Sequence, residues 1–415
     1  MSIQVQASSS VASSINSPSA VQGGLASVVA KILLPKLQIG HIVLKLPSGE
    51  QIDLRGTVPG IEARLVFHKW RALRRLLSGG VVGFAKAYAD GDWSTPDLTA
   101  MIELVARNGT QFVDRMNGNA VFRALNWLTH LRRANTRAGS RRNIEYHYDL
   151  GNEFYSLWLD RTMLYSSAIF ASPDQSLEEA QHDKLRQILS LLAIEPGQSV
   201  LEIGCGWGAL AAAMAREASA HVTGITLSPS QLAFGRDLIA QEYLGDQVNL
   251  KLEDYRDTSG QYDRLVSIEM IEAVGLEYWP SYFATIHHRL KPGGRAVLQA
   301  ITIAEDRFET YRTQPDFIQR YIFPGGCLPT KTSIRDCLAQ AGLCLVEQHD
   351  FADSYALTLA EWRRRFMNAW PRIEALGFDI SFKRLWEYYF CYCEAGFKTG
   401  AIDVGLYVIE HAKVE

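Results

Sequence analysis

The pattern of apolar and polar positions divides the chain into two parts with different expected folds. Three short alternating runs typical of strands lie at residues 41–46, 51–54 and 62–67, and the turn sequence Pro47-Ser-Gly-Glu50 separates the first two. Residues 69–135 then follow a helical pattern. We therefore predict a small α+β domain over residues 29–130, preceded by a Ser- and Ala-rich disordered tail at 1–28.

From about residue 180 the pattern alternates between helices and short apolar strands. Helices are expected at 177–192, 209–217 and 228–243, and strands at 199–203, 221–226, 248–252, 262–267 and 294–300. Apolar strands separated by helices predict an α/β fold with a mostly parallel central sheet covered on both faces. Residues 350–415 are expected to add further helices and the closing strands, so the second domain is placed at 143–415.

Composition fits a folded protein of two or three domains, with 415 residues, 47% of them hydrophobic and 21% charged. The formal net charge of −3 gives no basic excess for nucleic acid. No run of about 20 apolar residues could span a membrane, and the first residues lack a secretory signal pattern. Six scattered cysteines without zinc-site spacing indicate reduced thiols and no metal. A cytoplasmic location is expected.

Two basic segments have either a structural or a lipid-binding role. Residues 131–142 carry five arginines in twelve positions and form either a solvated linker or a segment attracted to anionic lipid headgroups. Residues 69–77, Lys-Trp-Arg-Ala-Leu-Arg-Arg-Leu-Leu, form either an interfacial helix or an ordinary amphipathic helix that buries its apolar stripe. The pattern leaves both alternatives open.

A glycine-rich turn joins the strand at 199–203 to the next helix. In Val200-Leu-Glu-Ile-Gly-Cys-Gly-Trp-Gly-Ala-Leu210, three glycines let the backbone turn tightly beside a ligand at the carboxyl end of the strand. A dinucleotide is disfavoured because Glu202 lies within the motif and the second strand lacks a terminal acid for a ribose. With Glu253-Asp254-Tyr255 after the next strand, these features resemble an S-adenosylmethionine-dependent methyltransferase, a Rossmann-like class I fold.

Further blocks narrow the resemblance to one family. The chain resembles the cyclopropane-fatty-acyl-phospholipid synthase and mycolic acid cyclopropane synthase family over about residues 140–410. The matching blocks, in order, are His147–Asn152, Met163–Ala168, the glycine loop, Asp254–Asp257, Ser267–Gly275, Arg320–Pro329 and Trp362–Trp370. A weaker match at Tyr88–Trp93 is similar to the phospholipid enzymes rather than the shorter mycolic ones.

The resemblance implies S-adenosylmethionine as cofactor. The matching cofactor positions are Tyr165 and Ser166 for the methionine part, Glu202, Gly204, Gly206 and Gly208 for the cradle, Thr226 and Gln231 for the ribose side, and Asp254 and Tyr255 for the adenine.

The family's reaction implies an apolar site with one base. An alkene in an acyl chain attacks the sulfonium methyl, a carbocation forms, and a base removes a proton from the new methyl to close a ring. Such a site excludes water, and aromatic faces stabilise its cations. The family's base is commonly a bound bicarbonate, and the matching positions are Glu272, Tyr355, Ile301, Ser167 in place of a cysteine, and Gln299 in place of a histidine.

These two departures leave the outcome of the reaction open. A serine hydroxyl and a glutamine amide still donate hydrogen bonds, but Gln299 cannot carry a positive charge and so holds an anion less strongly. Either bicarbonate binds and a cyclopropane forms, or Glu272 or a differently placed base removes another proton and leaves a methylene- or methyl-branched chain. Cys393 matches a cysteine that the family assigns as a nucleophile, and packing behind the site is favoured over that role.

The sequence therefore predicts a methyltransferase that acts on unsaturated acyl chains of phospholipids in a bilayer. The N-terminal domain and the basic linker would dock it peripherally on the inner face of the membrane, and a homodimer is the family's default. Two rivals are a methyltransferase for a soluble small molecule and a non-catalytic lipid- or cofactor-binding protein.

Overall fold

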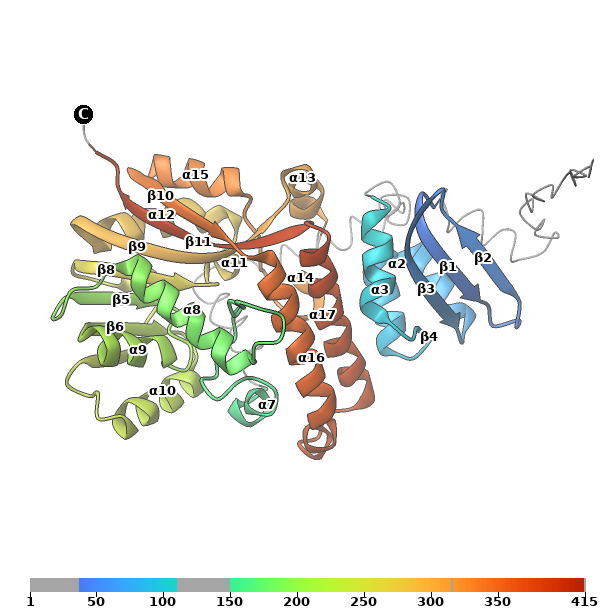
Figure 1. Cartoon of the computed structure of the whole chain (residues 1–415), viewed down its shortest axis with the longest axis horizontal. Coiled ribbons are helices and arrows are strands. Elements are labelled where there is room, and N and C mark those ends of the chain that lie inside the picture. The colour runs from blue at the N-terminus through green and yellow to red at the C-terminus, as the bar shows by residue number, and fades with distance from the viewer. Residues whose placement is uncertain (1–36, 110–149, 315, 414–415) are drawn as a thin grey trace, which may run out of the picture.

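The computed structural model describes residues 37–109, 150–314 and 316–413. The tail at 1–28, the basic linker at 131–142, the boundary between the two predicted domains and most of the His147–Asn152 block lie outside these residues. Figure 1 shows a small N-terminal unit beside a larger α/β unit, with two long helices between them.

The N-terminal unit is a four-stranded sheet covered by two helices. Its strands lie in the order β2-β1-β3-β4, with bounds Ile39–Lys45 (β1), Gln51–Arg55 (β2), Val58–Phe67 (β3) and Trp93–Ser94 (β4). The predicted hairpin of β1 and β2 is confirmed, and β3 begins four residues before its predicted start and pairs in parallel with β1. The helices are α2, Trp70–Ala89, which kinks at Gly80 (φ 57°), and α3, Leu98–Arg107.

The larger unit is built on a seven-stranded sheet in the order β10-β11-β9-β8-β5-β6-β7. The strands are β5 (Ser199–Ile203), β6 (His221–Thr226), β7 (Val248–Leu252), β8 (Tyr262–Ile268), β9 (Leu290–Ile303), β10 (Leu343–Asp350) and β11 (Ile402–His411). Five neighbouring strands from β9 to β7 are parallel, whereas β11 is antiparallel to both β9 and β10. The predicted mostly parallel sheet is confirmed, but only one closing strand, β11, falls within residues 350–415.

Side chains alternate between the two faces of this sheet and build a core on each. On one face Val200, Val222 and Val266 pack under α8 (Leu177–Leu192), α9 (Ala209–Ala218) and α10 (Pro229–Gln241). On the other face Leu201 and Leu265 pack under α12 (Trp279–Arg289) and α15 (Lys331–Gln340). The shorter helices are α7 (Asn152–Ser156), η1 (Tyr255–Asp257), α11 (Ile271–Val274), η2 (Leu276–Tyr278), α13 (Glu305–Thr313) and α14 (Phe317–Tyr321).

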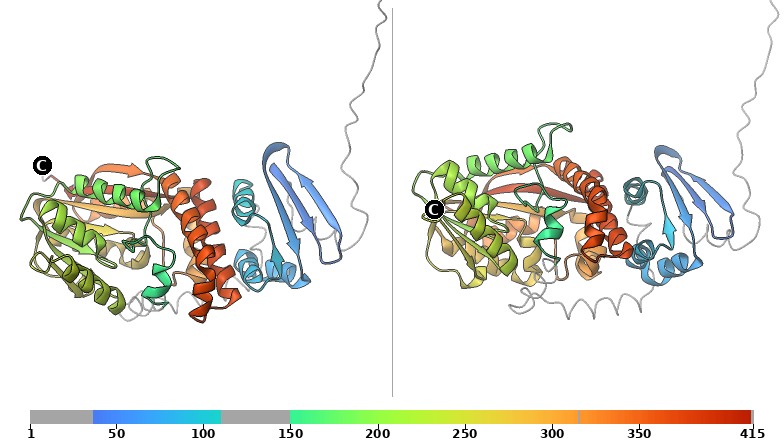
Figure 2. Two further views of the ribbon diagram at one scale, coloured as in Figure 1. Left: turned by 60° about the horizontal axis from the view of Figure 1, so that its bottom comes forward. Right: turned by 90° about the horizontal axis from the view of Figure 1, so that it is seen from below.

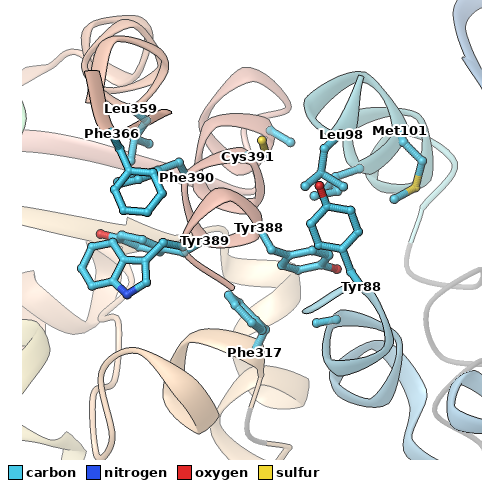
Figure 3. Packing of buried hydrophobic residues seen from close by; sticks show 14 of the residues in the cluster. Tyr88, Leu98, Met101, Phe317, Leu359, Phe366, Tyr388, Tyr389, Phe390 and Cys391 are labelled. Atoms are coloured by element: carbon cyan, nitrogen blue, oxygen red, sulfur yellow. The ribbon is translucent and has the colours of Figure 1, made fainter. Parts of the chain in front are cut away.

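Two long helices connect the sheet to the N-terminal unit, as Figure 2 shows from two sides. They are α16, Ala352–Ala375, and α17, Ile380–Lys398. In Figure 3, Tyr388 on α17 faces Tyr88 on α2 and lies near Leu98 on α3. The Tyr88 hydroxyl donates to Glu387 at 2.8 Å. The side chains of Tyr88, Leu98 and Tyr388 belong to one continuous hydrophobic core. The two units therefore pack as one body through α17.

No helix in the described part of the chain has the length and apolarity needed to cross a bilayer. Helix α2, the suggested interfacial helix, buries Ala72, Leu73 and Leu76 in the core, as an ordinary amphipathic helix does. Trp70 and Leu77 on the same helix stay 40% and 49% exposed.

Candidate active site

The glycine loop brings backbone to the carboxyl end of β5, where α/β sheets bind ligands. Gly204, Gly206 and Gly208 have φ values of 85°, 51° and 89°, a region that favours glycine. A Cβ on Gly206 would meet no atom within 4 Å, so open space faces this turn. Gly208 does not line the cavity described below; a Cβ there would lie 3.4 Å from the Cα of Gly235 on α10. Its closeness to that helix serves packing.

A cavity of about 590 Å³ begins at this loop and continues toward the N-terminal unit. Its cofactor end contains every other predicted cofactor residue, namely Tyr165, Ser166, Glu202, Gly204, Gly206, Thr226, Gln231, Asp254 and Tyr255. Its far end is mostly apolar and is lined by residues of α14, α17 and the N-terminal helices, including Phe317, Tyr389, Leu77, Met101 and Val105. One space therefore joins a polar cradle to an apolar channel.

The polar end fits S-adenosylmethionine. Glu202 is buried, burial raises its pKa to about 8, and its Oε2 has no hydrogen-bond partner among the described residues. A buried oxygen without a partner is costly unless a ligand donates to it. Nearby, Thr226 donates to the Oε1 of Gln231 at 2.8 Å, which fixes that amide beside the loop. When bound here, the cofactor supplies an electrophilic methyl group.

The remaining cofactor residues have clear neighbours. Asp254 forms an ion pair with Arg256 at 2.6 Å, and Tyr255 is buried below the same turn. The hydroxyls of Tyr165 and Tyr389 lie 3.1 Å apart, and Tyr165 packs against Trp362. These aromatic faces suit a sulfonium or a carbocation.

The residues expected to hold bicarbonate instead converge on Glu269. The backbone N–H of Ser167 and the Nε2 of Gln299 donate to its Oε1 at 2.8 and 2.7 Å. The hydroxyl of Tyr355 donates to its Oε2 at 2.6 Å. The Ser167 hydroxyl donates to the carbonyl of Ala168. Three of the five expected anion contacts are therefore made to a carboxylate of the protein itself.

The other two residues expected to hold bicarbonate, Glu272 and Ile301, contact each other. The backbone N–H of Ile301 donates to Oε1 of Glu272 at 2.6 Å, and the buried Oε2 of Glu272 has no partner among the described residues. Burial, together with the charge of Glu269, raises the pKa of Glu272 to about 8. Glu269, Glu272, Ile301 and Tyr355 all line the cavity. Burial raises the pKa of both carboxyls, and the three donors to Glu269 oppose that rise and favour its ionised form over that of Glu272.

Sequence reasoning missed Glu269 and Lys184. Lys184 on α8 is fully buried, its Nζ donates to the Oγ of Ser166 at 2.7 Å, and burial lowers its pKa to about 8. Glu269 stands in the quoted block Ser267–Gly275, at the end of β8 and three residues before Glu272. The available signal was its position at the carboxyl end of β8, the strand beside β5. The carboxyl ends of neighbouring parallel strands meet at one edge of the sheet, so a residue at this position is predicted to lie close to the glycine loop.

Cys393 lines the cavity, and burial raises the pKa of its thiol well above the usual range. A protonated thiol is a poor nucleophile, so the burial of Cys393 favours the packing role. Within the described residues, no group of three or more His, Cys, Asp or Glu side chains could hold a metal ion.

The mostly parallel sheet, the glycine loop and the cavity at the strand ends define a class I S-adenosylmethionine-dependent methyltransferase. A family model described as mycolic acid cyclopropane synthetase matches residues 135–406, and the chain belongs to this family. The predicted fold class, the family and S-adenosylmethionine as cofactor are thereby confirmed.

Three relatives show how far the similarity extends. Tuberculostearic acid methyltransferase UfaA1 of Mycobacterium tuberculosis is 37% identical over 400 residues, 92% of each chain. Cyclopropane-fatty-acyl-phospholipid synthase of Escherichia coli is 33% identical over 389 residues, 91% of this chain and 95% of that protein. The crystal structure of mycolic acid cyclopropane synthase CmaA1 complexed with SAH and CTAB is 30% identical, with a TM-score of 0.61, and covers 65% of this chain and 97% of its own.

Proposed function

We propose that this protein transfers a methyl group from S-adenosylmethionine to the cis double bond of an unsaturated phospholipid acyl chain. The observation that carries the proposal is the single cavity that joins the glycine loop to an apolar channel. The wall of this channel is mostly apolar, which suits an acyl chain that is apolar along its length. The paired carboxylates Glu269 and Glu272 supply a site for the proton that must leave.

The favoured product is a methylene-bearing chain. Ring closure needs a base that takes a proton from the new methyl while the adjacent carbon still carries the positive charge. Three hydrogen bonds to Glu269 stabilise its carboxylate and oppose the rise in pKa that burial causes, which gives the positive charge time to move to the methylated carbon by a hydride shift. Loss of a methyl proton from that cation leaves a methylene group. The chain is also similar to a protein named as a methyltransferase, tuberculostearic acid methyltransferase, and not only to proteins named as cyclopropane synthases.

A cyclopropane is the second candidate product. It is favoured by Glu272, Tyr355 and Ile301, which stand at the family's base positions, and by the similarity to the Escherichia coli synthase. The two products are isomers, so mass alone does not separate them.

The test is incubation of the purified chain with S-adenosylmethionine and vesicles of cis-monounsaturated phosphatidylglycerol and phosphatidylethanolamine. Gas chromatography of the released acyl chains separates methylene from ring. A gain of one CH2 as a methylene supports the proposal, and the same gain as a ring selects the second candidate. No gain on any vesicle, with methylation of a soluble substrate, would reject both.

Membrane contact is the remaining part of the proposal. Leu77 is 49% exposed and also lines the cavity, and Trp70 is exposed two turns earlier on α2. An exposed Trp and Leu on this helix would insert into the bilayer surface and let a phospholipid acyl chain enter the channel of the protein. We expect the double substitution Trp70→Ala with Leu77→Ala to reduce flotation with anionic vesicles. Tyr243→Ala, at a 94% exposed position on the α10–β7 connection, is the matched control and should float as the unchanged chain does.

A further inference from the structure

We infer that the carboxylate of Glu269 is the base that receives the substrate proton and that it takes the place of a bound bicarbonate. The inference rests on the proposed function and adds a catalytic residue to it. Glu269 lines the cavity and accepts hydrogen bonds from three separate elements. A carboxylate and a bicarbonate present the same pair of acceptor oxygens to such donors.

The three donors come from parts of the chain that lie far apart in sequence. Ser167 lies in the connection before α8, Gln299 on β9 and Tyr355 on α16, and the last two side chains are buried. Their donor groups surround one position, and the two carboxylate oxygens of Glu269 occupy it. Two anions so close together would repel each other, so an additional bicarbonate is excluded from these donors while Glu269 is ionised.

The backbone supports a specific role for this side chain. Glu269 has φ 50°, in the left-handed region that L side chains rarely adopt. Its N–H donates to the carbonyl of Gln299 at 2.8 Å, so β9 fixes both the backbone and the side chain of the residue. Such strained positions persist where the surrounding structure over-determines them, and they cluster at active sites.

Charge around the pair keeps the proton acceptor on Glu269. Burial raises its pKa, while the hydrogen bonds from Tyr355, Ser167 and Gln299 and the positive charge of Lys184 oppose that rise. Glu272 has only backbone donors among the described residues, the N–H of Ile301 and its own, and the charge of Glu269 raises its pKa further. The hydrogen bonds therefore favour ionisation of Glu269 over ionisation of Glu272.

The step balances without a further reactant. The S–CH3 bond breaks and leaves its electron pair on sulfur, while the alkene π pair forms the new C–CH3 bond. A hydride then shifts from the methylated carbon to the neighbouring cationic carbon. A C–H bond of the methyl breaks, its electron pair forms the C=CH2 double bond of the product, and the proton passes to a carboxylate oxygen of Glu269; without the shift, the same electron pair would close a ring. Glu269 later returns the proton to solvent.

The first experiment measures turnover of the full chain on monounsaturated vesicles in CO2-free buffer, with and without added bicarbonate. We expect rates equal within about twofold for the unchanged chain. Glu269→Gln should lower turnover by roughly 100-fold or more, with S-adenosylmethionine binding and thermal stability retained. Glu277→Gln, at an exposed position on η2, is the matched control and should turn over normally. Stimulation of the unchanged chain by bicarbonate, or normal turnover of Glu269→Gln, would overturn the inference.

A second variant tests the site without relying on turnover. Glu269→Gly opens the anion position, and its backbone conformation already favours glycine. We expect 13C-labelled bicarbonate to bind this variant and not the unchanged chain in the presence of S-adenosylhomocysteine. Bicarbonate bound to the unchanged chain would refute the inference, and this readout holds whether or not a phospholipid proves to be the substrate.

Discussion

Two nearby glutamates, Glu269 directly after β8 and Glu272 on α11, differ in what stabilises their ionised forms. Glu269 accepts hydrogen bonds from three donors, whereas Glu272 accepts from the Ile301 N–H, and burial raises the pKa of Glu272 to about 8. Keeping a carboxyl buried and neutral costs stability as pH rises, because the ionised form is desolvated. The buried carboxyl of Glu272 therefore lowers the stability of the fold at high pH, and replacing it with an uncharged side chain of the same shape measures this effect.

Glu272→Gln should stabilise the protein above neutral pH. Because the folded-state pKa of Glu272 is raised from 4.5 to about 8, the native state binds more protons than the unfolded state between those values. Its contribution therefore becomes less favourable as pH rises through that window. A glutamine oxygen can still accept from the Ile301 N–H. We expect equal melting temperatures near pH 5 and a higher one for the variant at pH 8.5, measured by differential scanning calorimetry.

The exposed substitution Glu277→Gln provides the comparison for that measurement. It should leave the difference in melting temperature unchanged between the two pH values. A Glu272→Gln variant that is less stable than the unchanged chain at pH 8.5 would mean that Glu272 is ionised and paired in the folded state.

The sequence predicts the position of a site residue only where the residues that act together lie in one continuous segment. The glycine loop and Glu202 lie in a single continuous motif, so their shared location at the cofactor end followed from spacing. Glu269 depends on donors 102, 30 and 86 residues away, and no local pattern reports such a meeting. Ser167 and Gln299 were recognised as departures, but the carboxylate that accompanies them was not.

At the scale of elements, the glycine loop depends on how closely α10 approaches it. A Cβ on Gly235 of α10 would lie 2.8 Å from Cδ1 of Leu250 and 3.2 Å from the carbonyl of Trp207. We expect Gly235→Ala to push α10 away from the loop, to destabilise the fold by about 1–3 kcal/mol and to weaken S-adenosylmethionine binding. Chemical denaturation and calorimetric titration measure the two effects.

Gly245→Ala is the control, because a Cβ there would meet nothing within 4 Å. It should change neither stability nor cofactor affinity measurably. Unchanged cofactor affinity in a destabilised Gly235→Ala would separate the packing of α10 from the shape of the binding loop.

Helices and strands of the large unit followed from periodicity because most bury one continuous face. Helix α8 begins and ends at its predicted residues, since Ser176 and Glu179 form a capping box and Leu185, Ile188 and Leu192 face the sheet. Strand β10 was not predicted, because it is an edge strand whose burial does not alternate regularly. Register, strand order and the position of α17 depend on tertiary packing and had no local signal.

At the scale of the whole molecule, the N-terminal unit closes the apolar end of the cavity. Met101, Ile102 and Val105 on α3 line this end, and Thr99 donates to Glu394 of α17 at 2.9 Å. The cofactor end lies wholly within the larger unit. If the acyl chain occupies the channel, a change on α3 should affect the lipid and leave the cofactor alone.

We expect Val105→Trp to abolish most lipid methylation, because the larger ring fills space that an acyl chain needs. Turnover on monounsaturated vesicles should fall by about tenfold or more, while calorimetric affinity for S-adenosylmethionine stays unchanged. Glu50→Trp adds the same ring to an exposed turn of the N-terminal unit and should keep full activity. Normal turnover of Val105→Trp would mean that the substrate reaches the reacting end without passing α3, and the channel would then belong to something other than the acyl chain.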